Sequence, residues 1–562
     1  MNQKSFILKY PILTMLLVNI CMYMIAFLFV RYYYSIGLPY YDSVGSYVQM
    51  FSVANTTRRL GFFAGIGSAI GYPLSWIQSF FAVFSSYILP NKPEWLIILN
   101  FLLLFLAQYS IYLYVKNVYS SRINAFILSF LPFFPGALMG WVGGYIDMRR
   151  DSSFLSLLIA GFFLFLDYTH SKKSCFSKGM LVGVLWGFTQ WSRGNALPYW
   201  FCIIGPVIMV HIFRISQRKE ILKYFIRLII PFSVAIIISF PFYYYNWQAI
   251  YEKYVFGSWG VGVDRLNAMY IFIKQFPILA FGPDRSSLLI NTFYFFGLCG
   301  LIIFFLRKKL VILDKTRFKS FRFKSLLYIG ILIVILMFIL NGVLLGVGDY
   351  LYPNYPVLVG VMSVMIYVIN GTKISYPISY YKLNTDLVLS LWIICILLAN
   401  ALRMFISMPQ NQQQLVMSTK KSAADLGPIL GGKRIAYMWL DHINVHDLNF
   451  YITQDGNVPI YAPSLLLPGV DTEMPPNPSK SVISQQEEYT KGMRVREYVI
   501  VTEDLKSYEN PKGFFFILRY GGPIVENIIH DPEFEKIYTF SDLTRNYQVL
   551  KNKKFNKDLH LL

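Results

Sequence analysis

Long uninterrupted stretches of apolar residues recur along the first 406 residues, and short polar or basic stretches separate them. A helix that crosses a membrane needs roughly 20 apolar residues, or about 17 at the short end. By this measure we predict about eleven spanning helices, at residues 8–30, 95–117, 122–140, 152–168, 179–195, 196–214, 222–244, 288–306, 325–347, 356–370 and 385–405. The chain is therefore predicted to be a polytopic α-helical membrane protein.

The segment 60–90 is also apolar, but glycine and proline interrupt it. It could be a twelfth span or a pair of helices that enter and leave the membrane on one side. Counting it as one full span would invert the side of every later loop. We therefore place residues 31–94 in a first outer loop that contains interfacial helices, inside a transmembrane domain of residues 1–406.

Basic residues decide the orientation, because cytoplasmic loops of membrane proteins carry an excess of lysine and arginine. With a cytoplasmic N-terminus, the inner loops hold Lys116 and Arg122, then Lys172, Lys173 and Lys178, then Arg214, Arg218, Lys219, Lys223 and Arg227, then Arg307, Lys308, Lys309, Lys315, Arg317, Lys319, Arg322 and Lys324, and last Lys373 and Lys382. This pattern predicts a multi-pass protein of the inner (cytoplasmic) membrane, with its C-terminus outside.

The composition changes after about residue 407, where Gln410 to Gln414 form a polar stretch that we read as a linker. Strand-like and helical segments then alternate. We expect strands at 434–440, 498–501, 513–518, 536–540 and 547–550, and helices near 442–453 and 525–530. Residues 407–562 are thus predicted to form an extracytoplasmic α/β domain of ordinary size.

Composition supports the membrane assignment. Hydrophobic residues make up 55% of the 562 residues and charged residues only 14%, against about 25% charged in typical soluble domains. The net charge is +21, but the apolar content argues against nucleic acid as a partner and favours anionic lipid head groups. The five cysteines lie before residue 407, mostly in apolar runs, which suggests small buried residues and not a metal cluster.

Ionisable and tyrosine side chains gather near span ends on the predicted outer side. They are Asp42, Arg58 and Arg59 in the first outer loop, Asp147, Arg149, Arg150 and Asp151 in the second, Arg193 before the sixth span, and Asp349, Tyr350 and Tyr352 before the tenth. Such groups are costly close to a bilayer and usually mark a substrate path. Structural roles are the alternative: Arg58 or Arg59 could reach lipid phosphate, Asp147 could pair with Arg149 or Arg150, and Asp42 could cap a helix.

This combination of residues suits a lipid-linked phosphate as substrate. The planar donors of arginine match phosphate oxygens. A carboxylate within reach of an acceptor hydroxyl can serve as general base, a contribution of roughly 10²–10⁴-fold. The predicted chemistry is therefore group transfer at the outer membrane surface.

Several segments, in this order, resemble the GT-C superfamily of membrane glycosyltransferases. They are YYDS with Asp42 in a long first outer loop, GYPLSWIQSFFAVF, the glycine-rich KGMLVGVLWGFTQWSRGNALPYW, GDYLYPNYPVLVGV, and the closing DPEFEKIYTFSDLTRNYQVLK. The resemblance covers most of the chain in architecture, although no single motif is very specific. It implies a GT-C-like helical bundle and an enzyme that takes sugar from a polyprenyl phosphate.

The resemblance also implies roles for individual residues. Asp42 would be the catalytic base, and Asp147 is the candidate for a second carboxylate, because Ser43 follows Asp42 where family members often have two adjacent acids. From the residues themselves, the candidates for binding donor phosphate or substrate are Arg58, Arg59, Arg149, Arg150, Asp151, Arg193, Tyr350 and Tyr352. Some family members use a divalent cation, but no residue pattern here requires a cofactor or predicts a metal site.

The leading hypothesis is an inverting transfer of one hexose or pentose from a polyprenyl-phosphate sugar donor to a glycan or lipid acceptor of the cell envelope, in contact with membrane lipids. A flippase or transporter of lipid-linked sugars is an alternative, as is an oligosaccharide polymerase or ligase. A transporter would place charges along a two-sided path, often with inverted repeats, which are not visible here.

Overall fold

The computed structural model of the chain divides into two compact units. The first comprises residues 1–31 and 62–408, and the second comprises residues 32–61 and 409–562. The structure describes residues 6–37, 41–71, 75–119, 122–133, 135, 144–148, 150–170, 176–194, 196–214, 218–251, 273, 321–340, 354–371, 385–406, 412–437, 445–461, 465–467, 470–471, 476–477, 480–509, 516–541 and 545–555.

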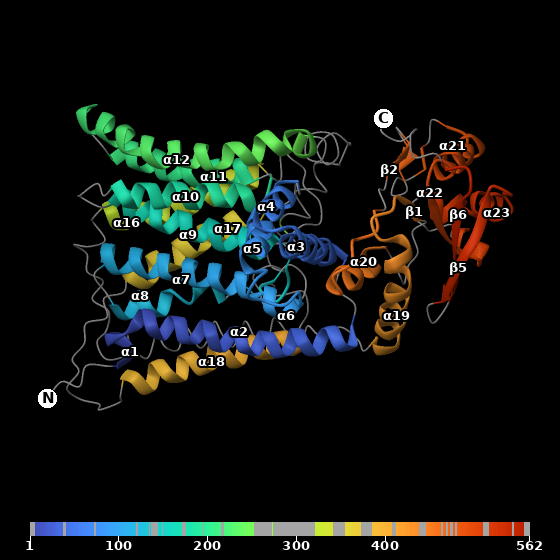
Figure 1. The fold of residues 1–562 in the computed structure, drawn as a ribbon. Helices are drawn as coiled ribbons and strands as arrows, with labels where there is room; N and C mark the ends of the chain where they lie inside the picture. Colours follow the sequence, from blue (N-terminus) through green and yellow to red (C-terminus); the bar gives the residue numbers. More distant parts are fainter. Residues whose placement is uncertain are drawn as a thin grey trace. The chain divides into compact units, whose positions relative to one another are not determined.

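The first unit is helical, and Figure 1 shows its long helices lying side by side in a bundle. Its elements are α1 (Phe6–Lys9), α2 (Pro11–Ile36, whose end belongs to the second unit), α4 (Phe62–Ile70), α5 (Trp76–Ser85), α6 (Pro93–Leu96), α7 (Ile98–Tyr119), α8 (Arg122–Leu128), the 3₁₀ turn η1 (Leu131–Phe133), α9 (Arg150–His170), α10 (Phe176–Ser192), α11 (Ala196–Arg214), α12 (Arg218–Tyr251), α16 (Phe321–Met337), α17 (Tyr355–Gly371) and α18 (Thr385–Ile406).

Most of the predicted spans coincide with helices of this unit. Within the described residues, six helices are long and apolar enough to cross a membrane: Pro11–Ile36, Pro93–Tyr119, Asp151–His170, Ala196–Phe213, Ile221–Gln248 and Asp386–Ile406. Shorter apolar helices cover parts of the predicted spans 122–140, 325–347 and 356–370, and α10 covers most of 179–195. The predicted span 288–306 lies outside the described residues. The helical membrane fold is confirmed, while the total number of spans stays a prediction.

The apolar segments 60–90 and 122–140 do not form long continuous helices in the structure. Across 60–90 the structure has α4 and α5, of 9 and 10 residues, and at 1.5 Å per residue neither reaches across a hydrocarbon core of about 30 Å. The continuous helix predicted at 122–140 is wrong, because α8 ends at Leu128 and one 3₁₀ turn follows. Pro132 lies in that turn, and proline removes a helical hydrogen bond and clashes with the preceding turn.

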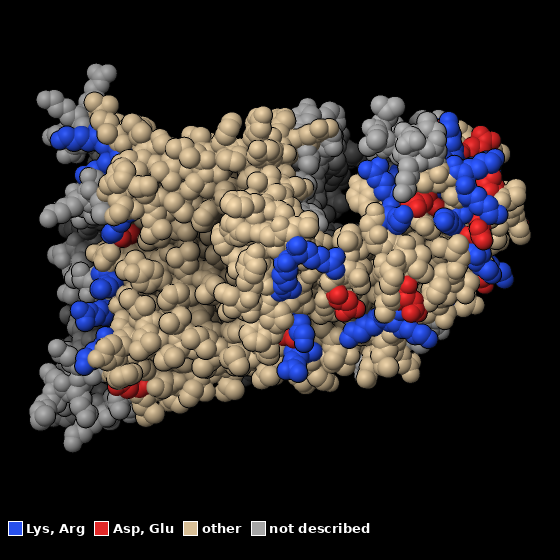
Figure 2. Space-filling model, viewed as in Figure 1, with Lys and Arg blue, Asp and Glu red and all other residues tan. Residues whose placement is uncertain are grey.

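The exposure of the bundle helices matches a lipid environment. The central helix α9 is almost entirely buried, whereas α2, α12 and α18 present large apolar side chains on their outer faces. A soluble protein rarely exposes such contiguous apolar surface. In Figure 2 the Lys and Arg side chains of this unit gather mainly at one end of the helices, and uncharged residues form the sides.

The basic end is the one where α7 ends and α10 begins. There Lys178 of α10 forms an ion pair with Asp167 of α9 at 2.8 Å, and Asn117 of α7 donates to the same carboxylate at 3.0 Å. Lys116 and Arg122 flank the connection between α7 and α8. These residues belong to the loops predicted to be cytoplasmic, and the orientation of the bundle in the membrane stays a prediction.

The second unit has an α/β fold, as predicted for the C-terminal segment. Its elements are α3 (Tyr41–Leu60), α19 (Gln413–Leu430), β1 (Ile435–Tyr437), α20 (Val445–Gln454), β2 (Leu465–Leu467), β3 (Val470–Asp471), α21 (Val482–Arg494), β4 (Tyr498–Thr502), the 3₁₀ turn η6 (Leu505–Tyr508), α22 (Phe516–Tyr520), α23 (Gly522–Ile529), β5 (Phe534–Ser541) and β6 (Asn546–Asn552).

Four strands form the main sheet in the order β1-β4-β6-β5. β1 pairs with β4 in parallel, with Ile435 opposite Tyr498, and the other two pairings are antiparallel. All five residues of β4 are buried, as expected for a central strand with both faces covered. β2 and β3 form a separate antiparallel pair.

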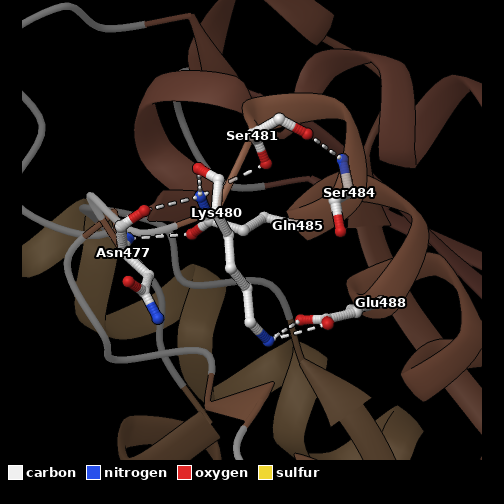
Figure 3. Close-up of polar contacts among 6 residues, drawn as sticks. All are labelled: Asn477, Lys480, Ser481, Ser484, Gln485 and Glu488. Atoms are coloured by element: carbon white, nitrogen blue, oxygen red, sulfur yellow. Dashed lines mark hydrogen bonds and ion pairs between the residues drawn. The ribbon is translucent and has the colours of Figure 1, made fainter.

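Side chains just before α21 and in its first turns fix the start of that helix (Figure 3). The Ser481 hydroxyl accepts from the Ser484 backbone N–H at 3.1 Å, an ordinary N-cap. Gln485 accepts from the Asn477 backbone N–H at 2.8 Å and donates to the Asn477 and Lys480 carbonyls. Lys480 also pairs with Glu488 at 2.7 Å. This is a capped structural helix, which the sequence analysis did not predict.

Two other predictions for this unit are wrong. The linker at 410–414 overlaps α19, since Gln413 and Gln414 already lie inside that helix. The strand expected at 513–518 is replaced over its described part by α22, in which Phe516 and Ile517 are fully buried. Phe516 stacks on Tyr489 of α21 at 5.0 Å, so tertiary packing outweighs the strand preference of an aromatic run.

Candidate functional site

The predicted site residues fall on both units of the structure. In the helical unit, Asp147 lies in the turn 144–148, Asp151 in the first turn of α9, and Arg193 just after α10. In the second unit, Asp42 lies in the first turn of α3, and Arg58 and Arg59 lie exposed in its last turn.

For the other predicted site residues, the structure does not describe the side chain or does not describe the residue at all. Arg150 begins α9, but its side chain is outside the described residues, as is the side chain of Asp42. Arg149, Asp349, Tyr350 and Tyr352 lie entirely outside the described residues. Their predicted roles therefore stay predictions.

Neighbouring helices fix the turn that carries Asp147. Asn100 of α7 donates from Nδ2 to the Tyr145 carbonyl at 3.1 Å and to the Asp147 carbonyl at 2.8 Å. Its Oδ1 accepts from the Ser153 hydroxyl of α9 at 3.2 Å, and Gln78 of α5 donates to the Met148 carbonyl. Buried carbonyls that are satisfied in this way define one backbone conformation, so the buried Asp147 is held close to the start of α9.

Tyr145 belongs to the same turn and is fully buried. The Ser156 hydroxyl of α9 lies 3.3 Å from its phenol oxygen. Burial raises the pKa of the Tyr145 phenol, an effect that the Ser156 hydrogen bond opposes. The phenol therefore stays protonated at neutral pH and acts as a hydrogen-bonding group without adding charge.

Asp151 and Arg193 form an ion pair between α9 and the end of α10, through Oδ1 and Nη1. Only 12% and 11% of their side chains are exposed. Asp151 lies in the first turn of α9, where the helix dipole favours negative charge. The structure thus brings together two of the predicted residues that are far apart in the sequence, in a pair largely removed from solvent.

The backbone around Arg193 is also fixed by hydrogen bonds. Its N–H donates to the Gln190 carbonyl at 3.2 Å. The Gln190 amide oxygen accepts from the Tyr243 hydroxyl of α12 at 2.6 Å, and that hydroxyl lies 3.4 Å from the Gly194 carbonyl. Three helices, α9, α10 and α12, therefore define where the guanidinium lies.

Aromatic side chains line the end of α10 beside this polar cluster. Trp191 stacks on Phe80 of α5 at 5.3 Å and meets Trp76 edge-on at 5.5 Å. Trp76 also contacts Phe242 of α12 at 5.3 Å, and the Trp191 indole donates to the Ile238 carbonyl at 2.8 Å. Tryptophan is typical of membrane–water interfaces, so this end of the bundle combines an apolar wall with a fixed cation.

One buried cation and two positioning amides were not among the predicted site residues. Arg403 of α18 is almost fully buried, and its Nη1 donates to the Phe133 carbonyl and to the Asn400 amide oxygen, each at 2.9 Å. An arginine inside the predicted span 385–405 was the available signal. Asn100 and Gln78 lie in or beside apolar runs, and only their contacts show their function.

The described residues around this end of the bundle are of the kinds that phosphate recognition and acid–base chemistry use. Within the part of the chain that the structure describes, no group of three or more His, Cys, Asp or Glu side chains could hold a metal ion. The arrangement offers arginine donors, buried carboxylates and an apolar aromatic wall. A lipid phosphate needs the first and the last of these.

No protein-family model and no curated protein sequence matches the chain. Among solved structures, it is similar to the crystal structure of ArnT from Cupriavidus metallidurans bound to undecaprenyl phosphate, with a TM-score of 0.52 and 9% identity over 95% of this chain and 97% of that one. It is also similar to ArnT from the same organism in the apo state, with a TM-score of 0.55 and 10% identity over the same shares. At these identities the likeness establishes the fold alone: the chain has the fold of ArnT.

Proposed function

We propose that this protein is a membrane glycosyltransferase that takes a sugar from a polyprenyl-phosphate donor. The observation that carries the proposal is the likeness to ArnT over 95% of the chain, in a structure with bound undecaprenyl phosphate. The bundle, with its aromatic and charged end, provides the elements that a lipid-phosphate substrate needs: apolar surface for the tail and arginine donors for the phosphate.

The donor phosphate is assigned to the arginines near the start of α9 and the end of α10. Arg193 is the best supported of them, because its ion pair with Asp151 and the surrounding helices fix its position. Arg149 and Arg150 are assigned to the same role from the sequence. Arginine matches phosphate oxygens with planar, charge-assisted donors, and a fixed guanidinium loses less entropy on binding than a mobile one.

Asp42 is assigned as the general base. In the proposed step, the Asp42 carboxylate takes the proton of the acceptor hydroxyl while the acceptor oxygen forms a bond to the anomeric carbon. The bond from that carbon to the donor phosphate oxygen breaks, and its electron pair leaves with the polyprenyl phosphate. A single displacement through an oxocarbenium-like transition state inverts the anomeric configuration.

The other assignments follow the same scheme. Asp147 is proposed to bind a sugar hydroxyl or the acceptor from its buried turn, and the acceptor is a glycan or lipid of the cell envelope. The basic end of the bundle is assigned to the cytoplasmic side, which puts the opposite end outside.

No divalent cation is required in this proposal, and unchanged transfer rates after chelation with EDTA would agree with that.

The proposal is tested by transfer from a defined donor. Purified full-length protein is incubated with polyprenyl-phosphate sugar and membrane acceptor lipids, and the products are analysed by mass spectrometry. We expect the acceptor mass to rise by one sugar, with one polyprenyl phosphate released per transfer. Ladders of added sugars would indicate a polymerase. Movement of intact donor across vesicles without any product would indicate a flippase.

A further inference from the structure

The acid-bearing helix α3 is held by a helix of the C-terminal segment. Phe450 of α20 is fully buried against three aromatic rings. It stacks on Tyr34 at the end of α2 (5.5 Å, 22°), meets Tyr47 of α3 edge-on at 5.7 Å, and lies 5.7 Å from Phe51 of α3. Tyr47 and Phe51 are four residues apart and so lie on one face of α3. This face is the one against which α20 packs.

Polar contacts link the same two helices further along. The Asn55 amide of α3 donates to the Thr453 carbonyl of α20 at 2.9 Å, and Arg59 donates to the Gly456 carbonyl. Gly456 has a φ of +86°, a left-handed conformation that favours glycine. Both acceptors are backbone carbonyls: that of Thr453 lies in the last turn of α20, where intrahelical partners run out, and that of Gly456 lies two residues beyond the helix. The contacts therefore define the register of α3 along α20 as well as its distance.

The chain segment before α3 is linked to the same C-terminal segment. The Gln412 backbone N–H, just before α19, donates to the Ile36 carbonyl at the end of α2 at 2.7 Å. Thus α3 is preceded and flanked by contacts with residues 409–562. This explains why residues 32–61 and 409–562 form one compact unit.

We propose that α20 is a positioning element for catalysis and that Phe450 is its principal positioning residue. The inference rests on the proposed function, in which Asp42 is the base. Asp42 precedes Tyr47 by five residues, or about 7.5 Å along the helix axis. A rigid helix transmits a shift at Tyr47 to Asp42, and a 1 Å misplacement can cost about 10²-fold in rate. The C-terminal domain thus contributes to the rate of transfer through α3.

A matched control lies on the same helix. Ile452 is as buried as Phe450 but faces α19, where a Cβ added at Gly427 would lie 3.5 Å from Ile452 Cγ1. Truncating either side chain removes core packing from α20. The Phe450 truncation removes the ring contacts with Tyr47 and Phe51 of α3, and the Ile452 truncation leaves those contacts in place, so the pair separates positioning from general stability.

The test compares four full-length variants with wild type for kcat, donor KM and the thermal unfolding midpoint. For Phe450→Ala we expect kcat to fall about 10- to 100-fold with donor KM within about twofold, and for Phe450→Leu a recovery of most of kcat. Asn55→Ala, a milder change that folds even if Phe450→Ala does not, should lower kcat several-fold. Ile452→Ala should lower the midpoint as Phe450→Ala does but leave kcat within about twofold of wild type.

The outcomes separate the two proposals. Wild-type kcat in both Asn55→Ala and Phe450→Ala would overturn the positioning role alone. So would a loss of kcat in Ile452→Ala that equals the loss in Phe450→Ala, since both would then reflect stability. No transfer by the wild-type protein from any polyprenyl-phosphate sugar would overturn the proposed function and, with it, this inference.

Discussion

Asp151 and Arg193 lie 42 residues apart in the sequence and meet in an ion pair that is largely buried. Such a pair contributes little net stability, because desolvation of both charges opposes their attraction. Removing one partner is different, since it leaves an uncompensated charge in the bundle. A stability cost of this kind must be separated from any loss of donor binding when the role of Arg193 is tested.

The double variant Asp151→Asn with Arg193→Gln makes this separation. Arg193→Ala alone should destabilise the protein by about 3–5 kcal/mol, whereas the neutral double variant should unfold near the wild-type temperature. If Arg193 binds the donor phosphate, the double variant still shows a raised donor KM. Thermal unfolding and transfer kinetics measure both effects, and a wild-type KM in the double variant would leave Arg193 with a structural role only.

Asn100 provides a second prediction at the level of a single residue. Asn100→Ala removes the donor to two buried carbonyls of the turn that carries Asp147, and each unsatisfied group costs about 1–3 kcal/mol. We expect a lower unfolding temperature and slower transfer. Asn117→Ala, which removes a contact at the opposite end of α7, serves as control. Equal losses of transfer in both variants would argue against a specific role of the turn.

The sequence predicted the charged residues Asp151 and Arg193 but not the contacts that each of them makes. Asp151 and Arg193 were identifiable because charged groups at span ends are costly and therefore informative. Their pairing depends on the packing of α9 against α10, which no local pattern encodes. Asn100 lies in an apolar run and carries no charge, so its function as the anchor of the turn could be seen only from its contacts.

At the level of elements, the glycine-rich helix α10 packs closely against α12. A Cβ added at Gly183 would lie 2.6 Å from the Pro231 carbonyl oxygen and from Val234 Cβ. One added at Gly187 would lie 2.5 Å from Ile238 Cγ2. Small residues that allow close backbone approach are the usual means of helix association in membranes. The glycines that supported the family resemblance thus have a packing function.

This close contact predicts that a glycine-to-alanine substitution destabilises the protein at some positions and not at others. Gly183→Ala should force α10 and α12 apart and cost about 1–3 kcal/mol, as overpacking does. Gly205→Ala in α11 is the matched control, since a Cβ there meets nothing within 4 Å. Unfolding midpoints of both variants in detergent check the prediction. A Gly183→Ala protein as stable as Gly205→Ala would contradict it.

The hydrophobic pattern of the sequence predicted helices well where an apolar run is also long enough to span a membrane, as in α2, α7 and α12. It failed where a residue with a special backbone requirement or a tertiary contact decided the outcome. Pro132 interrupts the apolar run after α8, and packing against Tyr489 makes Phe516 helical. Helices α19 and α21 were missed because their exposed faces are polar and resemble linker sequence.

At the level of the whole molecule, the orientation of the chain in the membrane decides whether the assigned base and phosphate-binding residues face the extracytoplasmic side. In a background without the five native cysteines, a single cysteine at the exposed Lys421 of α19 (K421C) should react with a membrane-impermeant maleimide in intact cells. A cysteine at the exposed Ser177 of α10 (S177C) should react only after permeabilisation. The reverse pattern would contradict the positive-inside assignment.

The most direct measurement is the rate of sugar transfer from a labelled polyprenyl-phosphate donor by the full-length protein in lipid nanodiscs, for wild type and Asp42→Asn. The control is Asp425→Asn, which changes an aspartate of the C-terminal segment that accepts a hydrogen bond from the Tyr538 hydroxyl. We predict transfer by wild type and Asp425→Asn, and a loss of roughly 10²–10⁴-fold in Asp42→Asn, the contribution of a general base. Absence of transfer by wild type, or equal rates in Asp42→Asn and wild type, would contradict the account.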